Sequence, residues 1–165
     1  MSETLPPQSW ASSVATRKSM RGNTRRDTSP EWKVRRLLHA RGLRYRVDLP
    51  LPFDKRRRAD ITFTRAKVMV FIDGCFWHAC PEHYVAPKAH PEYWGPKIAA
   101  NRARDVETTQ RLQADGWTVL RFWEHEDPES VALRVAAVVG DAAMAAAPAE
   151  REAAGAASSA GDRST

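Results

Sequence analysis

The segment from residue 68 to residue 78 constrains this chain more than any other. It begins with five apolar residues, Val68 to Ile72, a run typical of a strand that is buried on both faces. Reactive side chains follow at once in the order Asp73-Gly74-Cys75-Phe76-Trp77-His78. Apolar support directly before reactive groups is how a rigid scaffold positions a site. We therefore expect the fold to be organised around this strand and the turn after it.

The charge of the chain points to a polyanionic partner. The 165 residues include 26 Lys and Arg against 20 Asp and Glu, a net charge of +6, and the basic side chains concentrate between residues 17 and 58. This distribution suits nucleic acid, although a solvated surface has the same composition. No apolar run approaches about 18 residues, and the first ten residues lack the features of a signal peptide. We expect a cytoplasmic protein that does not span a membrane.

Composition divides the chain into a domain with two unstructured ends. Residues 1–16 are rich in Ser, Thr, Pro and Ala, which predicts disorder. Residues 17–28 form a basic arm suited to lying along a phosphate backbone. The domain is expected to span residues 17–140. Residues 141–165 form an Ala-rich tail that we expect to be disordered, although alanine also favours extending the preceding helix.

Periodicity within the domain predicts helices and strands in a mixed order. A helix is expected from Ser29, which can cap it, to Gly42, which ends it. Strands are expected at 44–49 and 59–64 with a loop at 55–58, and a short turn makes 59–64 and 67–73 an antiparallel hairpin. An irregular, proline-rich loop at 74–96 precedes a helix at 97–115, a strand at 117–123 and a helix at 128–139. This order indicates an α/β fold with a mixed sheet flanked by helices.

Two cysteines and two histidines have the spacing of a zinc site. Four residues separate Cys75 from Cys80, two separate Cys80 from His83, and His125 follows the last strand. In a reducing compartment such cysteines are better interpreted as metal ligands than as a disulfide. Four protein ligands leave no open position, so the pattern predicts a structural Zn²⁺ that holds the irregular loop to the sheet. Two buried cysteines with surface histidines are the alternative.

Acids and an imidazole are expected to meet beside the central strand. Antiparallel pairing places Asp60 near residues 72 and 73. Its carboxylate, with that of Asp73 or the backbone carbonyl of Ile72, can hold Mg²⁺. His78 lies a few residues further on and can take a proton from an attacking water.

Two more acids can join this group from the helices. Asp105, on the helix expected at 97–115, can orient the imidazole of His78, and Glu31 can approach from the first helix. Each acid also has an ordinary interpretation: a turn cap for Asp60, a surface ion pair for Asp105 and a helix-dipole partner for Glu31. On spacing alone, a metal-dependent phosphodiesterase and a zinc-stabilised nucleic-acid-binding module without catalysis both remain open.

Aromatic residues surround the reactive group. Phe76 and Trp77 are adjacent in a loop, and Trp94 lies in the same irregular region. Such side chains belong either to a core or to a wedge that opens a base step in duplex DNA. Met20, on the basic arm, can wedge from the opposite groove.

A set of short motifs occurs in a fixed order along the chain. The motifs are Arg17-Lys18-Ser19-Met20-Arg21, Ala59-Asp60, Val70 to His78, Tyr93-Trp94, Lys97-Ile98, Asn101 to Asp105, Gly116 to Leu120 and Trp123-Glu124. This set resembles the very-short-patch repair (Vsr) DNA mismatch endonucleases over residues 15 to 126. The resemblance implies a restriction-endonuclease-like, PD-(D/E)XK-type α/β fold. It also implies that the enzyme nicks duplex DNA 5′ to the T of a T·G mismatch left by deamination of 5-methylcytosine.

The resemblance implies a role for each matching position. It implies that Asp60 and the Ile72 carbonyl bind the metal and that His78 transfers the proton. Asp105 and Glu31 match the supporting acids. It implies that the side chains entering the DNA beside the mismatch are Phe76, Trp77 and Trp94, with Met20 intercalating from the minor groove. The arm residues expected on the DNA backbone are Arg17, Lys18 and Arg21.

The sequence departs from the family at two places. Asp73 stands where the best-known member has a histidine, so Asp73 either binds Mg²⁺ directly or alters the local field. Cysteine and histidine are exchanged within the zinc set, whose ligand count is kept. We expect a monomer with catalytic Mg²⁺ and structural Zn²⁺, with mismatched duplex DNA, mismatch-repair proteins and a repair polymerase as partners. The alternatives are a restriction-type nuclease with a different target and the non-catalytic module.

Overall fold

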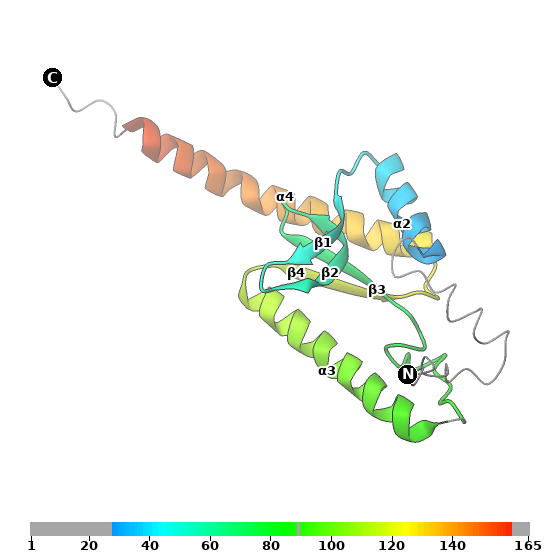
Figure 1. Ribbon diagram of the computed structural model, residues 1–165. Coiled ribbons are helices and arrows are strands. Elements are labelled where there is room, and N and C mark those ends of the chain that lie inside the picture. The colour runs from blue at the N-terminus through cyan, green and yellow to red at the C-terminus, as the bar shows by residue number, and fades with distance from the viewer. Residues whose placement is uncertain (1–27, 89, 160–165) are drawn as a thin grey trace, which may run out of the picture.

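A computed structural model describes residues 28–88 and 90–159, with side chains described as far as Met144 (Figure 1). The predictions for the basic arm, including Arg17, Lys18, Met20 and Arg21, lie outside the described residues. The elements in chain order are α2 (Ser29–Ala40), β1 (Arg46–Leu51), β2 (Asp54–Phe63), β3 (Val68–Asp73), α3 (Pro91–Ala114), β4 (Thr118–Trp123) and α4 (Pro128–Ser159).

Four strands form one mixed sheet in the order β1-β2-β3-β4. The pairs β1–β2 and β2–β3 are antiparallel, and Phe63 pairs with Val68 across the hairpin turn. The pair β3–β4 is parallel, with Phe71 opposite Arg121. A parallel neighbour requires a long crossover, which the loop after β3 and helix α3 provide. The predicted mixed sheet and its hairpin are confirmed.

The alternating side chains of β3 serve two separate cores. Val68 and Val70 pack in the larger core, with residues of α2 and α4 such as Leu38. Met69 and Phe71 pack in the smaller one, which includes Leu112 of α3. Successive side chains of a strand point to opposite faces, so an apolar strand of this kind needs a cover on both. Figure 1 shows α2 and α4 on one side of the sheet and α3 on the other.

The basic segment 55–58 is strand rather than the expected loop. It is part of β2, where Arg58 pairs with Pro50 and Ala59 with Leu49. Proline in β1 is tolerated because β1 is an edge strand, whose outer side needs no amide donor. The register shifts directly after Pro50.

The helices begin and end at other residues than the sequence predicts. Thr28, not Ser29, is the N-cap of α2, while Gly42 follows its end at φ 79° as expected. Helix α3 begins at Pro91, inside the segment 74–96 that was expected to be irregular throughout, because proline suits a first helical turn. Pro96 lies further inside and removes one main-chain hydrogen bond. Residues 141–159, expected to be disordered, continue α4, since alanine has the highest helix propensity.

None of the helices in the described part of the chain is both long enough and apolar enough to cross a lipid bilayer.

Candidate active site

A hollow of about 360 Å³ gathers the predicted acids and the imidazole at one end of β3. Acids reach it from β1, α2, β2, β3 and α3, and the arginines of β2 form part of its rim. Both signs of charge therefore meet in one concave surface. Its lining includes Glu31, Asp60, Asp73, His78, Asp105 and Arg121, together with Ile72.

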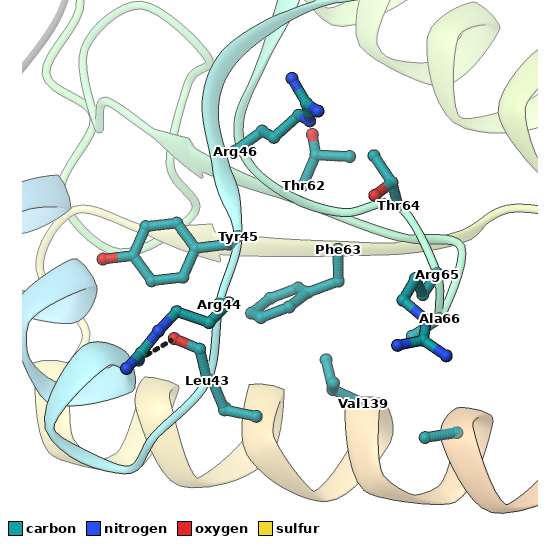
Figure 2. Close-up of a pocket in the computed structure, with 11 residues that line it drawn as sticks. Leu43, Arg44, Tyr45, Arg46, Thr62, Phe63, Thr64, Arg65, Ala66 and Val139 are labelled. Carbon is teal, nitrogen blue, oxygen red and sulfur yellow. Dashed lines mark hydrogen bonds between the residues drawn. The ribbon is translucent and has the colours of Figure 1, made fainter.

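A larger hollow of about 760 Å³ lies elsewhere, between the β1–β2 end of the sheet and α4 (Figure 2). Its floor includes Tyr45, Phe63 and Val139, and its arginines are Arg44, Arg46 and Arg65. Among the residues that the structure describes, no acid or imidazole lines it. The smaller hollow is therefore the candidate active site, because it holds the acids and the imidazole although it is not the larger of the two.

Asp60 lies where the antiparallel pairing predicts. Its Oδ2 accepts a hydrogen bond of 2.7 Å from the backbone N–H of Ile72. Burial raises the pKa of Asp60 to about 7, and Glu31 and Asp73 add to the rise although the Ile72 N–H opposes it. An ionised carboxylate among other acids needs a nearby cation. The donor set thus fits Mg²⁺, with the Asp60 carboxylate and the neighbouring Ile72 carbonyl as the hard oxygen ligands that this ion takes.

His78 and Asp105 form a directly bonded pair. The His78 Nδ1 lies 2.5 Å from the Asp105 Oδ2. With the Nδ1 proton directed at the carboxylate, Nε2 is the nitrogen left to accept a proton. Burial lowers the pKa of His78, but the hydrogen bond to Asp105 and the charge of Asp73 outweigh it, and the net effect is a raised pKa. The Asp105 carboxyl has a lowered pKa, because His78 and Arg121 overcome its burial.

Arg121 is the member of this group that the sequence did not reveal. Its Nε and Nη2 donate to the two carboxylate oxygens of Asp73 at 2.8 and 2.6 Å. Its Nη2 also lies 2.9 Å from the Asp105 Oδ1. The available signal was a single arginine between Leu120 and Phe122 in an otherwise apolar strand.

The bidentate pairing changes the interpretation of Asp73. Both of its oxygens accept from Arg121, which neutralises the carboxylate and occupies its metal-binding edge. Asp73 is buried, and its Oδ1 lies 3.7 Å from the His78 Nδ1. The geometry favours Asp73 as an anchor for Arg121, whereas Asp60 keeps the features of a metal ligand.

Glu31 reaches the hollow from the first turn of α2, as predicted. One of its oxygens accepts from the Thr28 hydroxyl at 2.8 Å, and the other from Arg35 at 2.8 Å. Glu31 is buried and lines the hollow together with Asp60. Its charge is therefore balanced on the helix side while it still contributes to the field at Asp60.

The four predicted zinc ligands converge. One ligand atom from each of Cys75, Cys80, His83 and His125 lies within 4.8 Å of the other three. The His125 Nδ1 is 3.2 Å from the Cys75 Sγ and 3.7 Å from the Cys80 Sγ. A tetrahedral zinc with ordinary bond lengths separates its ligand atoms by roughly 3.5 Å, so the donor set fits that ion.

Glu124 holds the first residue of this Cys/His group from the end of β4. The Glu124 Oε1 accepts a hydrogen bond of 2.7 Å from the backbone N–H of Cys75. The Glu124 N–H in turn donates to the Asp73 carbonyl at 2.9 Å. The loop after β3 is thus tied to the strand that supplies His125.

The aromatic residues of the loop and α3 form one cluster outside both cores. The Phe76 ring centroid lies 5.1 Å from that of Trp77 and 5.4 Å from that of Trp94. The Lys97 Nζ lies 5.6 Å from the Trp77 ring and 5.4 Å from the Trp94 ring. All three rings are half-buried, and neither hydrophobic core includes them. The aromatics therefore stabilise one another at the surface next to His78.

The fold and the site indicate an enzyme that cleaves phosphodiesters. This reaction is suited by three features of the hollow: a carboxylate that can bind a divalent cation, a histidine oriented by an aspartate, and a rim of arginines. The sequence model of the family described as DNA mismatch endonuclease Vsr matches residues 12–83.

Individual relatives agree with the family match. The type II nicking enzyme V.NaeI of Lentzea aerocolonigenes is 46% identical over 124 residues, which cover 74% of this chain and 73% of the relative. The DNA mismatch endonuclease Vsr of Escherichia coli K12 is 39% identical over 116 residues, covering 67% of this chain and 70% of the relative. The type II nicking enzyme V.NmeDIP of Neisseria meningitidis is 39% identical over 112 residues, covering 67% and 74%. This chain belongs to the Vsr family of DNA endonucleases, so the resemblance inferred from its motifs is confirmed.

Proposed function

We propose that this protein nicks duplex DNA on the 5′ side of the T in a T·G mismatch, by Mg²⁺-dependent hydrolysis of one phosphodiester. The observation that carries the proposal is the meeting of Asp60 and the His78–Asp105 pair in one arginine-rimmed hollow. Membership of the Vsr family supplies the substrate class.

Four residues of the hollow have roles in this reaction. The Asp60 carboxylate and the Ile72 carbonyl would hold Mg²⁺, which supplies positive charge to the scissile phosphate when it is bound. The His78 Nε2 takes a proton from water as the water oxygen bonds to phosphorus and the bond to the leaving sugar oxygen breaks. Asp105 holds the imidazole in the required tautomer and stabilises its charge after proton transfer.

The Cys/His group and the aromatic cluster serve the same substrate. Zn²⁺ on Cys75, Cys80, His83 and His125 would fix the loop that carries Phe76 and Trp77. The half-buried rings beside His78 suit insertion into an unstacked base step. A wobble mismatch stacks less firmly than a matched pair, so wedging would favour it.

A comparison of duplexes tests the proposal. Nicking is measured on a T·G duplex and on the matched C·G duplex of the same sequence, each in several flanking contexts, with and without Mg²⁺. We expect Mg²⁺-dependent nicking of the T·G strand only, and loss of nicking in Asp60→Ala and His78→Ala with the fold intact. Equal cleavage of the matched duplex would indicate a restriction-type nuclease, and binding without any cleavage would indicate a non-catalytic module.

A further inference from the structure

Arg121 joins two of the acids that line the hollow. Its guanidinium donates to Asp73 through two nitrogens and reaches Asp105 with one of them. All three side chains are mostly shielded from water, with relative exposures of 22% for Arg121, 11% for Asp73 and 24% for Asp105. Hydrogen-bonded charges at such positions are screened little by solvent or salt.

The strand register explains how Arg121 is held in place. Phe71 and Arg121 are opposite each other on the parallel strands β3 and β4, and the Arg121 guanidinium lies 5.0 Å from the Phe71 ring centre. Asp73 is two residues beyond Phe71 and so points to the same face of the sheet. That face is covered by α3, the helix that carries Asp105. The arginine is therefore fixed by a ring beneath it and by a bidentate carboxylate beside it.

The two oxygens of Asp105 have different partners. Oδ1 faces the Arg121 Nη2 at 2.9 Å, and Oδ2 faces the His78 Nδ1 at 2.5 Å. A carboxylate bonded at one oxygen alone can rotate about its terminal bond, whose energy wells are broad. The hydrogen bond at Oδ2 and the ion pair at Oδ1 together restrict that rotation, and hence the direction in which the imidazole points.

The same guanidinium lies where a cation would otherwise be attracted. Asp73, His78 and Asp105 offer ligand atoms that all lie within 4.8 Å of one another. Without Arg121 these groups would form a second place for a divalent ion beside the one at Asp60. With Arg121 present, a fixed positive charge is already bonded to both carboxylates.

We propose that Arg121 is a positioning residue for His78, acting through Asp105, and that its guanidinium keeps a divalent ion away from Asp73 and His78. The first part rests on the proposed function, in which His78 takes the proton from water. The chain of contacts runs Asp73, Arg121, Asp105, His78. Its first and last links are hydrogen bonds of 2.6 and 2.5 Å, and the middle link is an ion pair of 2.9 Å.

Arg121→Gln, Arg121→Lys and the control Arg134→Gln test the proposal on the full chain. Arg134 is a fair control because it also pairs with an acid, Glu126 at 3.0 Å, and lies 4.7 Å from the ring centre of Phe122, but it is outside the hollow. For Arg121→Gln we expect the single-turnover nicking rate to fall roughly 10- to 100-fold, the usual effect of losing a group that orients a catalytic ligand. The affinity for T·G duplex should stay nearly unchanged, and Arg134→Gln should nick like the wild type.

Arg121→Lys keeps the positive charge but changes the hydrogen-bond geometry, so it distinguishes the effects of the two. Lysine cannot make the paired bonds to Asp73 while also reaching Asp105, so we expect slow nicking in a protein that remains folded. If Arg121→Lys or a folded Arg121→Gln nicks at the wild-type rate, the positioning role is refuted. The double variant Asp73→Asn/Arg121→Gln removes both charges. Restored nicking there would show that Arg121 only neutralises Asp73, and would overturn the proposal.

A spectroscopic measurement separates this proposal from the proposed function. The ¹⁵N signals of the His78 ring, assigned by their loss in His78→Gln, report its tautomer without any DNA. We expect the tautomer protonated at Nδ1 in the wild type and a mixture in Arg121→Gln, with Mn²⁺ broadening those signals more strongly in the variant. If the wild type fails to nick T·G duplex, the proposed function fails, but the tautomer result stands. An unchanged tautomer and unchanged broadening in the variant refute the inference.

Discussion

Replacing Asp60 by asparagine should stabilise the protein in Mg²⁺-free buffer while abolishing its nicking activity. Burial and two neighbouring acids raise the pKa of Asp60 to about 7, whereas the unfolded chain loses this proton near pH 4. Between those pH values the folded protein binds a proton that the unfolded chain has lost. The free energy of unfolding therefore decreases as the pH rises through that window. Asparagine carries no charge and can still accept from the Ile72 N–H.

The size of the effect follows from the pKa difference. A rise of about three pH units corresponds to at most about 4 kcal/mol, since each unit is worth about 1.4 kcal/mol. Partial hydration of the hollow and the extra amide protons of asparagine reduce this, so we expect about 2 kcal/mol at pH 8. For a domain of this size that amounts to an increase in Tm on the order of 5–15 °C.

Thermal melts of wild type and Asp60→Asn at pH 6 to 8.5 measure the effect. The gain should be largest at pH 8.5 and shrink towards pH 6, and Mg²⁺ should stabilise only the wild type. Asp127→Asn is a matched control, because Asp127 accepts from the Ser130 N–H and its pKa is lowered. That variant should not raise the Tm. A Tm for Asp60→Asn at or below that of the wild type at pH 8 would refute the reasoning.

Two further predictions concern the loop after β3. Cys80→Ala should release bound Zn²⁺, which a colorimetric chelator measures. It should also lower the Tm, because the proposed ion ties the loop to His125. An unchanged melt would refute the structural role of Zn²⁺. Trp77→Ala should weaken binding and nicking of T·G duplex while lowering the Tm only slightly, because the ring is half-buried and lies in neither core. Fluorescence anisotropy and single-turnover nicking measure both effects, and normal mismatch discrimination in this variant would contradict the wedge.

The sequence predicted best where one local pattern determines the outcome. The apolar run of β3 and the short turn before it specify the hairpin, and the hairpin alone brings Asp60 to Ile72. The short spacing between Cys75, Cys80 and His83 likewise allows one loop to bring the ligand atoms of all three residues together. In these cases the partners are separated by short, stereochemically limited connections.

The sequence predicted less where the outcome depends on distant partners. Arg121 is informative only once the parallel register of β3 and β4 places it beside Asp73, and no local pattern encodes that register. Proline disfavours the interior of helices and strands, yet Pro91 begins a helix and Pro50 lies in an edge strand, two positions that tolerate it. The basic run at 55–58 is predicted to be a loop, yet it belongs to β2, and Arg58 pairs with β1.

Strand β4 lies at an edge of the sheet and yet supplies both halves of the site. Arg121 reaches the acids around His78, Glu124 receives the Cys75 amide, and His125 completes the Cys/His group. Its partner strand β3 is separated from it by the whole crossover, so this contact requires the closure of a large loop. A chain in which β4 has not yet docked lacks both the oriented histidine and the fixed loop.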